Sequence, residues 1–313
     1  MNPVLHVPFE AMACHCEIAL AGLPDEASSR ALAAQAIAEV RRIETKYSRY
    51  RADSIVSRIN AAAGGDPVAC DDETLSLLDY ANSMHQSSGG LFDITSGVLR
   101  RAWNFKQPRV PTEAELAPLR ALIGWPEVQR DGALLRLPRA GMELDFGGFG
   151  KEYAADRAGA LLATQGLRHG YVNLGGDFRV IGPKPDGSPW MMGIQHPRQR
   201  GALVATIPVS QGGLATSGDY ERFFELDGRR YCHILDPRSG MPVTQWQTVS
   251  VLAPLALVAG HCSTVAMLLQ AEGLRFLEAS GMDYLAVDQQ GHIHLKDAAT
   301  PAAAQPGVTG STP

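Results

Sequence analysis

The densest group of chemically useful side chains lies in residues 215–243, ATSGDYERFFELDGRRYCHILDPRSGMPV. His233 stands three residues before Asp236, and both side chains are of the kind that accept and donate protons. Core packing accounts for the aromatic residues of the segment but not for the Thr-Ser-Gly-Asp run at 216–219. The segment therefore predicts a shaped functional loop. The alternative is a tight turn held by its Asp-Pro and Ser-Gly pairs.

A second segment has the form of a phosphate site. Residues 142–162, MELDFGGFGKEYAADRAGALL, carry an apolar stretch that ends in Asp145 and a glycine-rich turn that opens directly into a helix. Backbone N–H groups at such a helix start can hold phosphate, and Lys151 adds a positive charge. GGFGK is neither the Walker pattern nor the dinucleotide fingerprint, so an ordinary strand-to-helix turn stays open as the alternative.

Two further segments place polar groups next to glycines. Residues 89–105, GGLFDITSGVLRRAWNF, put an aromatic ring, a carboxylate and two hydroxyls in a loop just after a helix. Residues 171–182, YVNLGGDFRVIG, form a strand that is broken by two glycines, where another backbone or a ligand must approach closely.

The elements that must position these segments alternate without a regular βαβ rhythm. Apolar spacing and caps predict helices over 25–47, 71–86, 149–165 and 256–279, and a short one after the capping box of Thr112 and Glu115. Strands are predicted near 142–146, 171–174, 178–182, 190–195, 203–209, 230–235 and 248–253. Asp-Gly pairs at 131–132 and 227–228 indicate hairpin turns. The pattern favours an α+β fold with mixed, largely antiparallel sheets and packed helices.

Composition bounds the remaining possibilities. A hydrophobic content of 45% in 313 residues is ample for a core, and residues 1–297 are expected to form a single domain with room for two subdomains. Residues 298–313 are Pro, Gly, Ala and Thr with few others, which predicts a disordered tail. A net charge of -5 gives no footprint for nucleic acid or an anionic membrane.

Targeting and redox signals are weak. No stretch is long and apolar enough for membrane insertion, and the first residues lack the pattern of a signal peptide, so the expected location is cytoplasmic. Five widely spread cysteines fit reduced thiols better than a disulfide framework. Cys14, His15 and Cys16 could hold a metal, but their alternation suits a strand and no second ligand pair follows at zinc spacing.

The four segments, in this order, resemble the FAD:protein FMN transferase family, the ApbE-type flavin transferases. The resemblance extends to Met12 with the following CHCEIAL, to YSRYRADSIVSRIN at 47–60 and to SVLAPLALVAGHCSTVAMLL at 250–269, and so covers roughly residues 9–288. It implies an ApbE-like fold. It also implies that FAD is the substrate, that Mg²⁺ is the cofactor, and that the partner is an acceptor protein with a Thr/Ser flavinylation motif.

Carried over position by position, the resemblance implies a flavin pocket and a metal site. Magnesium near the pyrophosphate is held partly by the backbone carbonyl of Gly150 and by Thr264. The flavin pocket consists of Met12, Tyr50, Leu91, Phe92, Asp93, Asp145, Lys151, His233 and Ile234.

The implied reaction is attack of a Thr or Ser hydroxyl of the acceptor protein on the FMN-side phosphorus of FAD, with release of AMP. Magnesium and Lys151 neutralise charge on the phosphate. His233 and Asp236 are the candidates for the general base, since either could reach a hydroxyl.

The chain departs from the family pattern at the metal site. Gly260 stands where the last helix usually carries a magnesium-binding Asp, four residues before Thr264, and Glu152 replaces the usual Gly after the lysine. An Ala-Cys pair also replaces the usual Gly-Thr of the opening strand. Loss of an oxygen ligand weakens a magnesium site, and Glu152 or Asp219 are the candidates to compensate. Two alternatives therefore stay open: a catalytically impaired FAD-binding or carrier protein, and an FAD pyrophosphatase that gives FMN and AMP.

Overall fold

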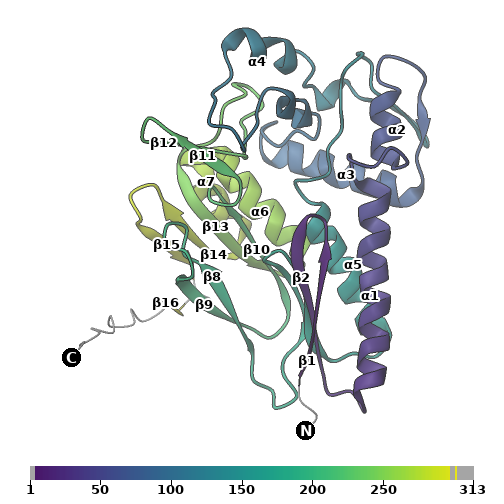
Figure 1. Cartoon of the computed structure of the whole chain (residues 1–313), viewed down its shortest axis with the longest axis vertical. Coiled ribbons are helices and arrows are strands. Elements are labelled where there is room, and N and C mark those ends of the chain that lie inside the picture. Colours follow the sequence, from purple (N-terminus) through teal and green to yellow (C-terminus); the bar gives the residue numbers. More distant parts are fainter. Residues whose placement is uncertain (1–3, 297–299, 302–313) are drawn as a thin grey trace.

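A computed structural model describes residues 4–296 and 300–301, and an antiparallel sheet forms the centre of the molecule (Figure 1). Within the described residues this sheet has eight strands, and every neighbouring pair is antiparallel. In spatial order they are β1 (Leu5–Ala11), β2 (Cys14–Ala21), β6 (His169–Leu174), β7 (Asp177–Gly182), β10 (Gly212–Gly218), β13 (Trp246–Ala253), β14 (Asp283–Asp288) and β15 (Ile293–Lys296). The predicted α+β class with largely antiparallel sheets is confirmed.

Helices cover one face of this sheet, chiefly α1 (Glu26–Tyr47), α5 (Gly150–Thr164) and α6 (Ala256–Leu269). The other α-helices of the described residues are α2 (Ile55–Ala61), α3 (Asp72–Ser87), α4 (Glu113–Arg120) and α7 (Gly273–Ser280). α1 packs on α5, α5 lies on β6 and β7, and α6 lies on β10 and β13. Because α6 is covered by the sheet and by other helices, it is apolar on almost every side. None of the helices in the described residues has the length and apolar character needed to cross a bilayer.

Short strands cover the remaining surfaces. β8 (Trp190–Gln195) and β9 (Leu203–Val209) enclose an apolar cluster with the other face of the main sheet. The hairpin of β11 (Phe223–Leu226) and β12 (Arg229–Cys232) packs with α4 and the 3₁₀ helix η1 (Ser96–Arg101) around Trp103. A third small sheet contains β3 (Val68–Ala69), β4 (Gln129–Asp131) and β5 (Leu134–Arg136). The two Asp-Gly hairpins predicted from the sequence are thus confirmed.

The predicted helix starts are confirmed by their caps. The Asp71 carboxylate accepts a hydrogen bond from the backbone N–H of Thr74 at 3.0 Å, at the start of α3. Thr112 and Glu115 form the expected capping box at the start of α4. Each cap satisfies backbone N–H groups that have no partner inside the helix.

The strand predicted at 142–146 is absent from the described structure, and the reason is an unusual partner. The backbone N–H and carbonyl of Leu144 bond to the side-chain amide of Asn60, at 2.6 and 3.0 Å. The backbone N–H of Asp145 donates to the carbonyl of Ile94 at 2.9 Å. An amide side chain therefore takes the place of a neighbouring strand, and the segment is an extended loop.

The single helix predicted over 256–279 is wrong, because it is interrupted between α6 and α7. Gln270 has a positive φ of 50° and belongs to a 3₁₀ turn, Gln270–Glu272. Its carbonyl accepts a hydrogen bond from the indole of Trp246 at 2.7 Å, and its side chain accepts one from the N–H of Thr244 at 3.1 Å. These bonds to the β13 region hold the break in place.

The C-terminal part of the described chain contributes one short strand. Most of residues 298–313, for which a disordered tail is predicted, lie outside the described residues; within this range Thr300–Pro301 pairs with β9 as strand β16. Proline is acceptable there because β16 lies at the edge of its sheet.

All five cysteines are free thiols, as expected, and Cys14 begins strand β2.

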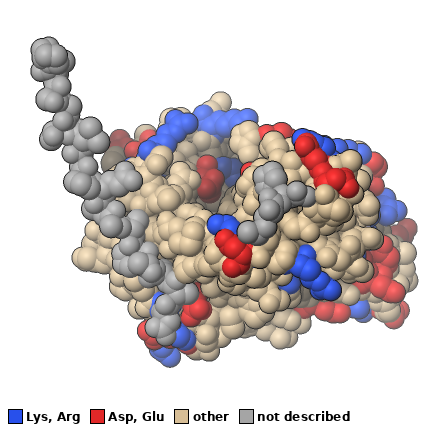
Figure 2. All heavy atoms as spheres, turned by 90° about the horizontal axis from the view of Figure 1, so that it is seen from below, with Lys and Arg blue, Asp and Glu red and all other residues tan. Residues whose placement is uncertain are grey.

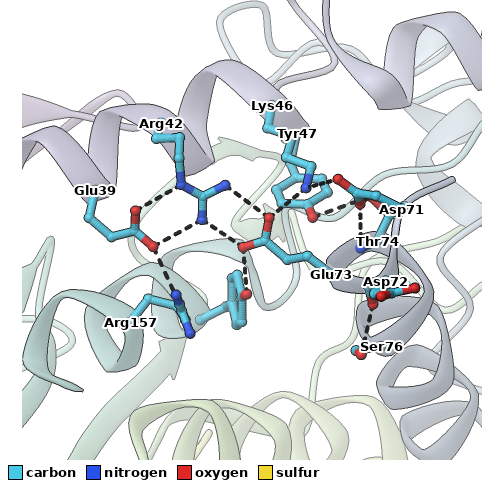
Figure 3. Close-up of polar contacts among 11 residues, drawn as sticks. Glu39, Arg42, Lys46, Tyr47, Asp71, Asp72, Glu73, Thr74, Ser76 and Arg157 are labelled. Atoms are coloured by element: carbon cyan, nitrogen blue, oxygen red, sulfur yellow. Dashed lines mark hydrogen bonds and ion pairs between the residues drawn. The ribbon is translucent and has the colours of Figure 1, made fainter. Parts of the chain in front are cut away.

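A network of charged side chains ties α1, α3 and α5 together (Figure 3). The Glu73 carboxylate accepts hydrogen bonds from Arg42, Lys46 and Tyr153 at 2.5–2.9 Å. The bonds from Arg42 and Lys46 hold the pKa of Glu73 well below its usual range, although partial burial opposes ionisation. One carboxylate on α3 thus fixes α1 and α5, the two helices that carry the loops of the candidate site.

We expect Glu73→Gln to lower the free energy of unfolding at pH 7 by about 1–3 kcal/mol, because charged hydrogen bonds from three partners are weakened. A depressed carboxyl pKa stabilises the fold above the unfolded value near 4 and loses that effect as pH falls. Urea unfolding at pH 7 and pH 3 should therefore show a difference from wild type that shrinks in acid. The exposed ion pair of Glu272 with Arg275 provides the control: Glu272→Gln should change stability by less than about 0.5 kcal/mol. Equal losses in the two variants would contradict the prediction.

Candidate active site

The start of α5 brings a lysine and two carboxylates together. Lys151 is in the first turn of the helix, and its Nζ donates to the buried Asp177 carboxylate at the start of β7, at 2.5 Å. Burial disfavours the ammonium, but Asp177 and Glu152 outweigh this effect and raise the pKa of Lys151. Lys151 is therefore a fixed positive charge beside the N-terminus of α5, where an anionic group would be stabilised.

Glu152 is the unsatisfied group of this cluster. It is 7% exposed, and its Oε2 has no hydrogen-bond partner among the described residues. Burial, together with the nearby Asp177 carboxylate, raises the pKa of Glu152 to about 8. A buried carboxylate oxygen without a donor is costly, so the position requires a proton or a cation.

Hydroxyl groups of α6 and β10 form a second cluster, and β10 reaches the first one where the backbone N–H of Thr216 donates to the Asp177 carboxylate at 3.3 Å. Ser217 Oγ is 2.9 Å from Ser263 Oγ and 3.0 Å from Thr264 Oγ1. The position of α6 is fixed from α5, because the Asp156 carboxylate accepts hydrogen bonds from the first backbone N–H groups of α6 at 3.0 and 2.8 Å. The helix pair thus presents oxygen donors next to a lysine.

Asp145, predicted as a pocket residue, is held by an arginine that the sequence reasoning did not single out. The Arg49 guanidinium donates from Nη1 to the Asp145 carboxylate and from Nη2 to the Tyr50 hydroxyl, the second bond at 2.8 Å. The latter bond lowers the pKa of Tyr50, a residue that is 79% exposed. Gly147 N–H also donates to Asp145 at 2.9 Å, which shapes the glycine-rich turn before α5. The predicted residues Tyr50 and Asp145 are therefore brought together through Arg49.

The loop after α3 packs under the same glycine-rich turn. Leu91 and Phe92 are buried, and a Cβ added at Gly148 would lie 2.9 Å from the Phe92 ring. The Asp93 carboxylate is occupied within the loop, because it accepts hydrogen bonds from the N–H groups of Thr95 and Trp125 at 2.7 and 3.0 Å. Asp93 thus shapes the loop that carries Phe92.

His233 lies just beyond β12 rather than on a strand. The predicted strand at 230–235 ends at Cys232, because the carbonyl of Ile234 accepts a hydrogen bond from Val243 N–H at 3.0 Å and turns the chain away. His233 Nδ1 is buried without a partner in the described structure. Burial and the nearby Arg222 guanidinium lower the pKa of His233 to about 4, so its imidazole is neutral near pH 7.

Asp236, the other base candidate, is engaged in a turn. Its carboxylate accepts hydrogen bonds from the backbone N–H of Arg238 at 2.8 Å and from the Arg238 guanidinium at 3.0 Å. The turn continues to Gly240, whose carbonyl accepts a hydrogen bond from the Trp103 indole at 2.7 Å. This geometry matches the turn that was the alternative explanation of the segment.

The opening hairpin places Cys14 near Lys151, and Met12 lies in the turn of the same hairpin. Met12 has a positive φ of 53°, and its backbone N–H donates to the Glu44 carboxylate at 2.6 Å. A Cβ at Gly175 would lie 2.9 Å from Cys14 Sγ, which confirms the close approach predicted at the two glycines. A hydrogen bond with Cys16 and the charge of Lys151 lower the pKa of Cys14. Cys14 therefore belongs to the same region as Lys151, and Met12 precedes it by two residues in the hairpin.

Three side chains of the site were missed from the sequence. Arg49 and Asp177 lie inside two of the motifs that were singled out, adjacent to a tyrosine and a glycine pair, so the motifs themselves were the available signal. Ser217 lies in the Thr-Ser-Gly-Asp run, of which the sequence analysis distinguished only Asp219. Among the described residues no three His, Cys, Asp or Glu side chains form a self-sufficient metal cluster.

Comparison with known sequences identifies relatives of the chain. The sequence profile of the ApbE family matches residues 12–286. The FAD:protein FMN transferase of Vibrio cholerae is 30% identical over 271 residues, which cover 84% of this chain and 81% of that protein. An FAD:protein FMN transferase of Klebsiella pneumoniae is 34% identical over 229 residues, which cover 71% of each chain.

Solved structures are similar over almost the whole chain. The ApbE protein of Thermotoga maritima has a TM-score of 0.86 and 30% identity, with coverage of 94% of this chain and 97% of that one. The flavin transferase ApbE from Vibrio cholerae has a TM-score of 0.84 and 28% identity, with coverage of 94% and 98%. The family profile and these relatives together show that this chain belongs to the ApbE family.

Proposed function

We propose that this chain is an FAD:protein FMN transferase, which moves the FMN half of FAD onto a Thr or Ser hydroxyl of an acceptor protein and releases AMP. Family membership supports the reaction class. The observation that carries the proposal is the pair of Lys151 and Glu152 in the first turn of α5, together with the hydroxyls of Ser217 and Thr264 on the neighbouring β10 and α6. Such a combination of cation, helix dipole and oxygen donors suits a pyrophosphate.

The donor chemistry of the cluster fits Mg²⁺, which prefers oxygen ligands and is bound through one or two carboxylates together with substrate phosphates. The resemblance assigns the backbone carbonyl of Gly150 and the hydroxyl of Thr264 to the metal. Glu152 Oε2, which has no hydrogen-bond partner in the described site, is a further oxygen that could bind the metal. When bound, Mg²⁺ neutralises charge on the phosphates of FAD.

The residues around the cluster suit the rest of the dinucleotide. The exposed ring of Tyr50 and the partly exposed Met12 offer aromatic and apolar surface for the flavin and adenine rings, and the buried Phe92 supports the glycine-rich turn from below. The Arg49 guanidinium holds Asp145 and Tyr50 in place. On the face shown in Figure 2, basic and acidic side chains are intermixed, so no single sign of charge dominates this surface.

The reaction needs a group that takes the proton of the attacking hydroxyl. As the hydroxyl oxygen bonds to the FMN-side phosphorus, the bond from that phosphorus to the AMP oxygen breaks, and the proton passes to a base. His233 is the better candidate, because its imidazole is neutral near pH 7 and its Nδ1 has no partner among the described residues. Asp236 is already engaged by Arg238. Lys151 stabilises the negative charge on the phosphate.

The test is to incubate the full chain with FAD, Mg²⁺ and a peptide that bears a Thr/Ser flavinylation motif. The expected result is a peptide whose mass has increased by FMN, with an equal amount of AMP. Release of AMP and free FMN without peptide modification would show a pyrophosphatase. Intact FAD that stays bound to the protein would show a flavin carrier, and either of these results would overturn the proposal.

A further inference from the structure

Two departures from the family pattern, at positions 152 and 260, are in direct contact. A Cβ built on Gly260 would lie 2.6 Å from Glu152 Oε1 and 2.7 Å from Glu152 Cγ. These distances are shorter than side chains allow, so the Glu152 carboxylate fills the space that a side chain at position 260 would occupy. The two changes, which lie 108 positions apart in the sequence, are therefore one feature in space.

This contact places the Glu152 carboxylate beside the hydroxyl cluster. Thr264 lies four residues after Gly260 on α6, and residues with this spacing are neighbours on one helix face. Thr264 Oγ1 contacts Ser217 Oγ at 3.0 Å. The carboxylate, the threonine and the serine therefore face a common region between α5, α6 and β10.

Among the described residues, no group satisfies the second oxygen of the Glu152 carboxylate. Oε2 has no partner among the described residues, although the side chain is 93% buried. The adjacent cation, Lys151, points to Asp177 instead. The other candidate to compensate for Gly260 is not free, because both oxygens of Asp219 accept hydrogen bonds from Arg198 at 2.7 Å.

We propose that Glu152 supplies the carboxylate ligand of the divalent cation in this chain, from α5 instead of α6, and that glycine at position 260 makes room for it. The inference rests on the proposed function, since the phosphates of FAD would complete the coordination. The chain has then moved the acidic ligand from one helix to its neighbour and kept it in the same space. It follows that the site keeps a carboxylate in spite of Gly260.

Binding of Mn²⁺, followed by electron paramagnetic resonance of the free ion in the presence of FAD, tests the ligand directly. Glu152→Gln preserves the shape of the side chain and should weaken Mn²⁺ binding by at least about tenfold, the scale already seen when a partner of a metal ligand is lost. The exchange variant Glu152→Gly with Gly260→Asp should bind Mn²⁺ more tightly than Glu152→Gly alone. The control is Asp219→Asn, which should keep the wild-type affinity.

The thermal midpoint provides a second readout that does not depend on metal. Gly260→Asp alone should lower Tm by several degrees, because its Cβ overlaps Glu152, and the added Glu152→Gly change should reverse that loss. Unchanged Mn²⁺ affinity in Glu152→Gln, or an unchanged Tm in Gly260→Asp, would overturn the inference. If Glu152→Gln loses Mn²⁺ but wild type transfers no FMN, the ligand assignment holds and the proposed function fails. If wild type transfers FMN but Glu152→Gln keeps the wild-type affinity for Mn²⁺, the proposed function holds and the ligand assignment fails.

Discussion

Replacing His233 with alanine is expected to lower the rate of FMN transfer by about 10²–10⁴-fold, the usual contribution of a general base. The expectation rests on a buried imidazole whose Nδ1 has no partner in the described structure and which is neutral at pH 7. The loss should fall on kcat, because proton removal belongs to the transition state and not to binding of FAD. Single-turnover transfer to the peptide, with AMP measured in parallel, gives the rate.

The pH profile distinguishes this role from a structural one. Burial and Arg222 lower the pKa of His233 to about 4, so the base stays unprotonated as pH falls through 6.5. The part of the transfer rate that depends on His233 should therefore be lost only near pH 4. The same shift means that the unfolded chain takes up the proton first, so folding stability decreases as pH falls from 6.5 towards 4.

Two variants complete the test of His233. His292 is an exposed histidine that pairs with Asp288 in the turn between β14 and β15, and His292→Ala should leave transfer unchanged. Asp236→Asn should have a smaller effect than His233→Ala, since Arg238 already occupies that carboxylate. The assignment would be contradicted if Asp236→Asn lowered the transfer rate as much as His233→Ala does. It would also be contradicted if the wild-type transfer rate fell with a midpoint near pH 6.5.

Local signals in the sequence predicted those parts of the fold that depend on neighbours along the chain. The cap at Asp71, the capping box at Thr112 and the two Asp-Gly hairpins depend on residues within a few positions, and all are present. Prediction failed where a distant group replaces a local partner. Asn60 bonds to Leu144 in place of a strand, and Trp246 holds the break after α6 at Gln270.

In the candidate site, too, local sequence patterns were informative and contacts between distant residues were not predicted. Motif order was enough to indicate the family and to mark Lys151, Asp145 and His233. It could not show that Glu152 and Gly260 touch, because a contact between two helices leaves no trace in either local pattern. The turn at Asp236 also needed structure, since an Asp-Pro pair serves a turn and a functional loop equally well.

The contact between α6 and β10 depends on one glycine, and we expect Gly213→Ala to destabilise the fold by about 3 kcal/mol or more. A Cβ on Gly213 would lie 2.0 Å from the backbone nitrogen of Ala256 and 2.3 Å from the carbonyl carbon of Leu255. Both obstacles are backbone atoms at the start of α6, which cannot move aside as the end of a flexible side chain can. The steric overlap can therefore be removed only if α6 shifts away from β10.

Such a shift would also separate the two halves of the site. Ser217 lies on β10 and Thr264 on α6, and their hydroxyls are 3.0 Å apart only because the helix lies directly on the strand. Urea unfolding followed by far-UV circular dichroism and tryptophan fluorescence measures the loss of stability, and Mn²⁺ binding with FAD measures the loss of the site. In the control Gly65→Ala, the new methyl meets only the Ala62 carbonyl oxygen at 3.3 Å, so a much smaller change is expected. A Gly213→Ala variant with the wild-type midpoint and intact Mn²⁺ binding would mean that α6 is not held against β10 as described.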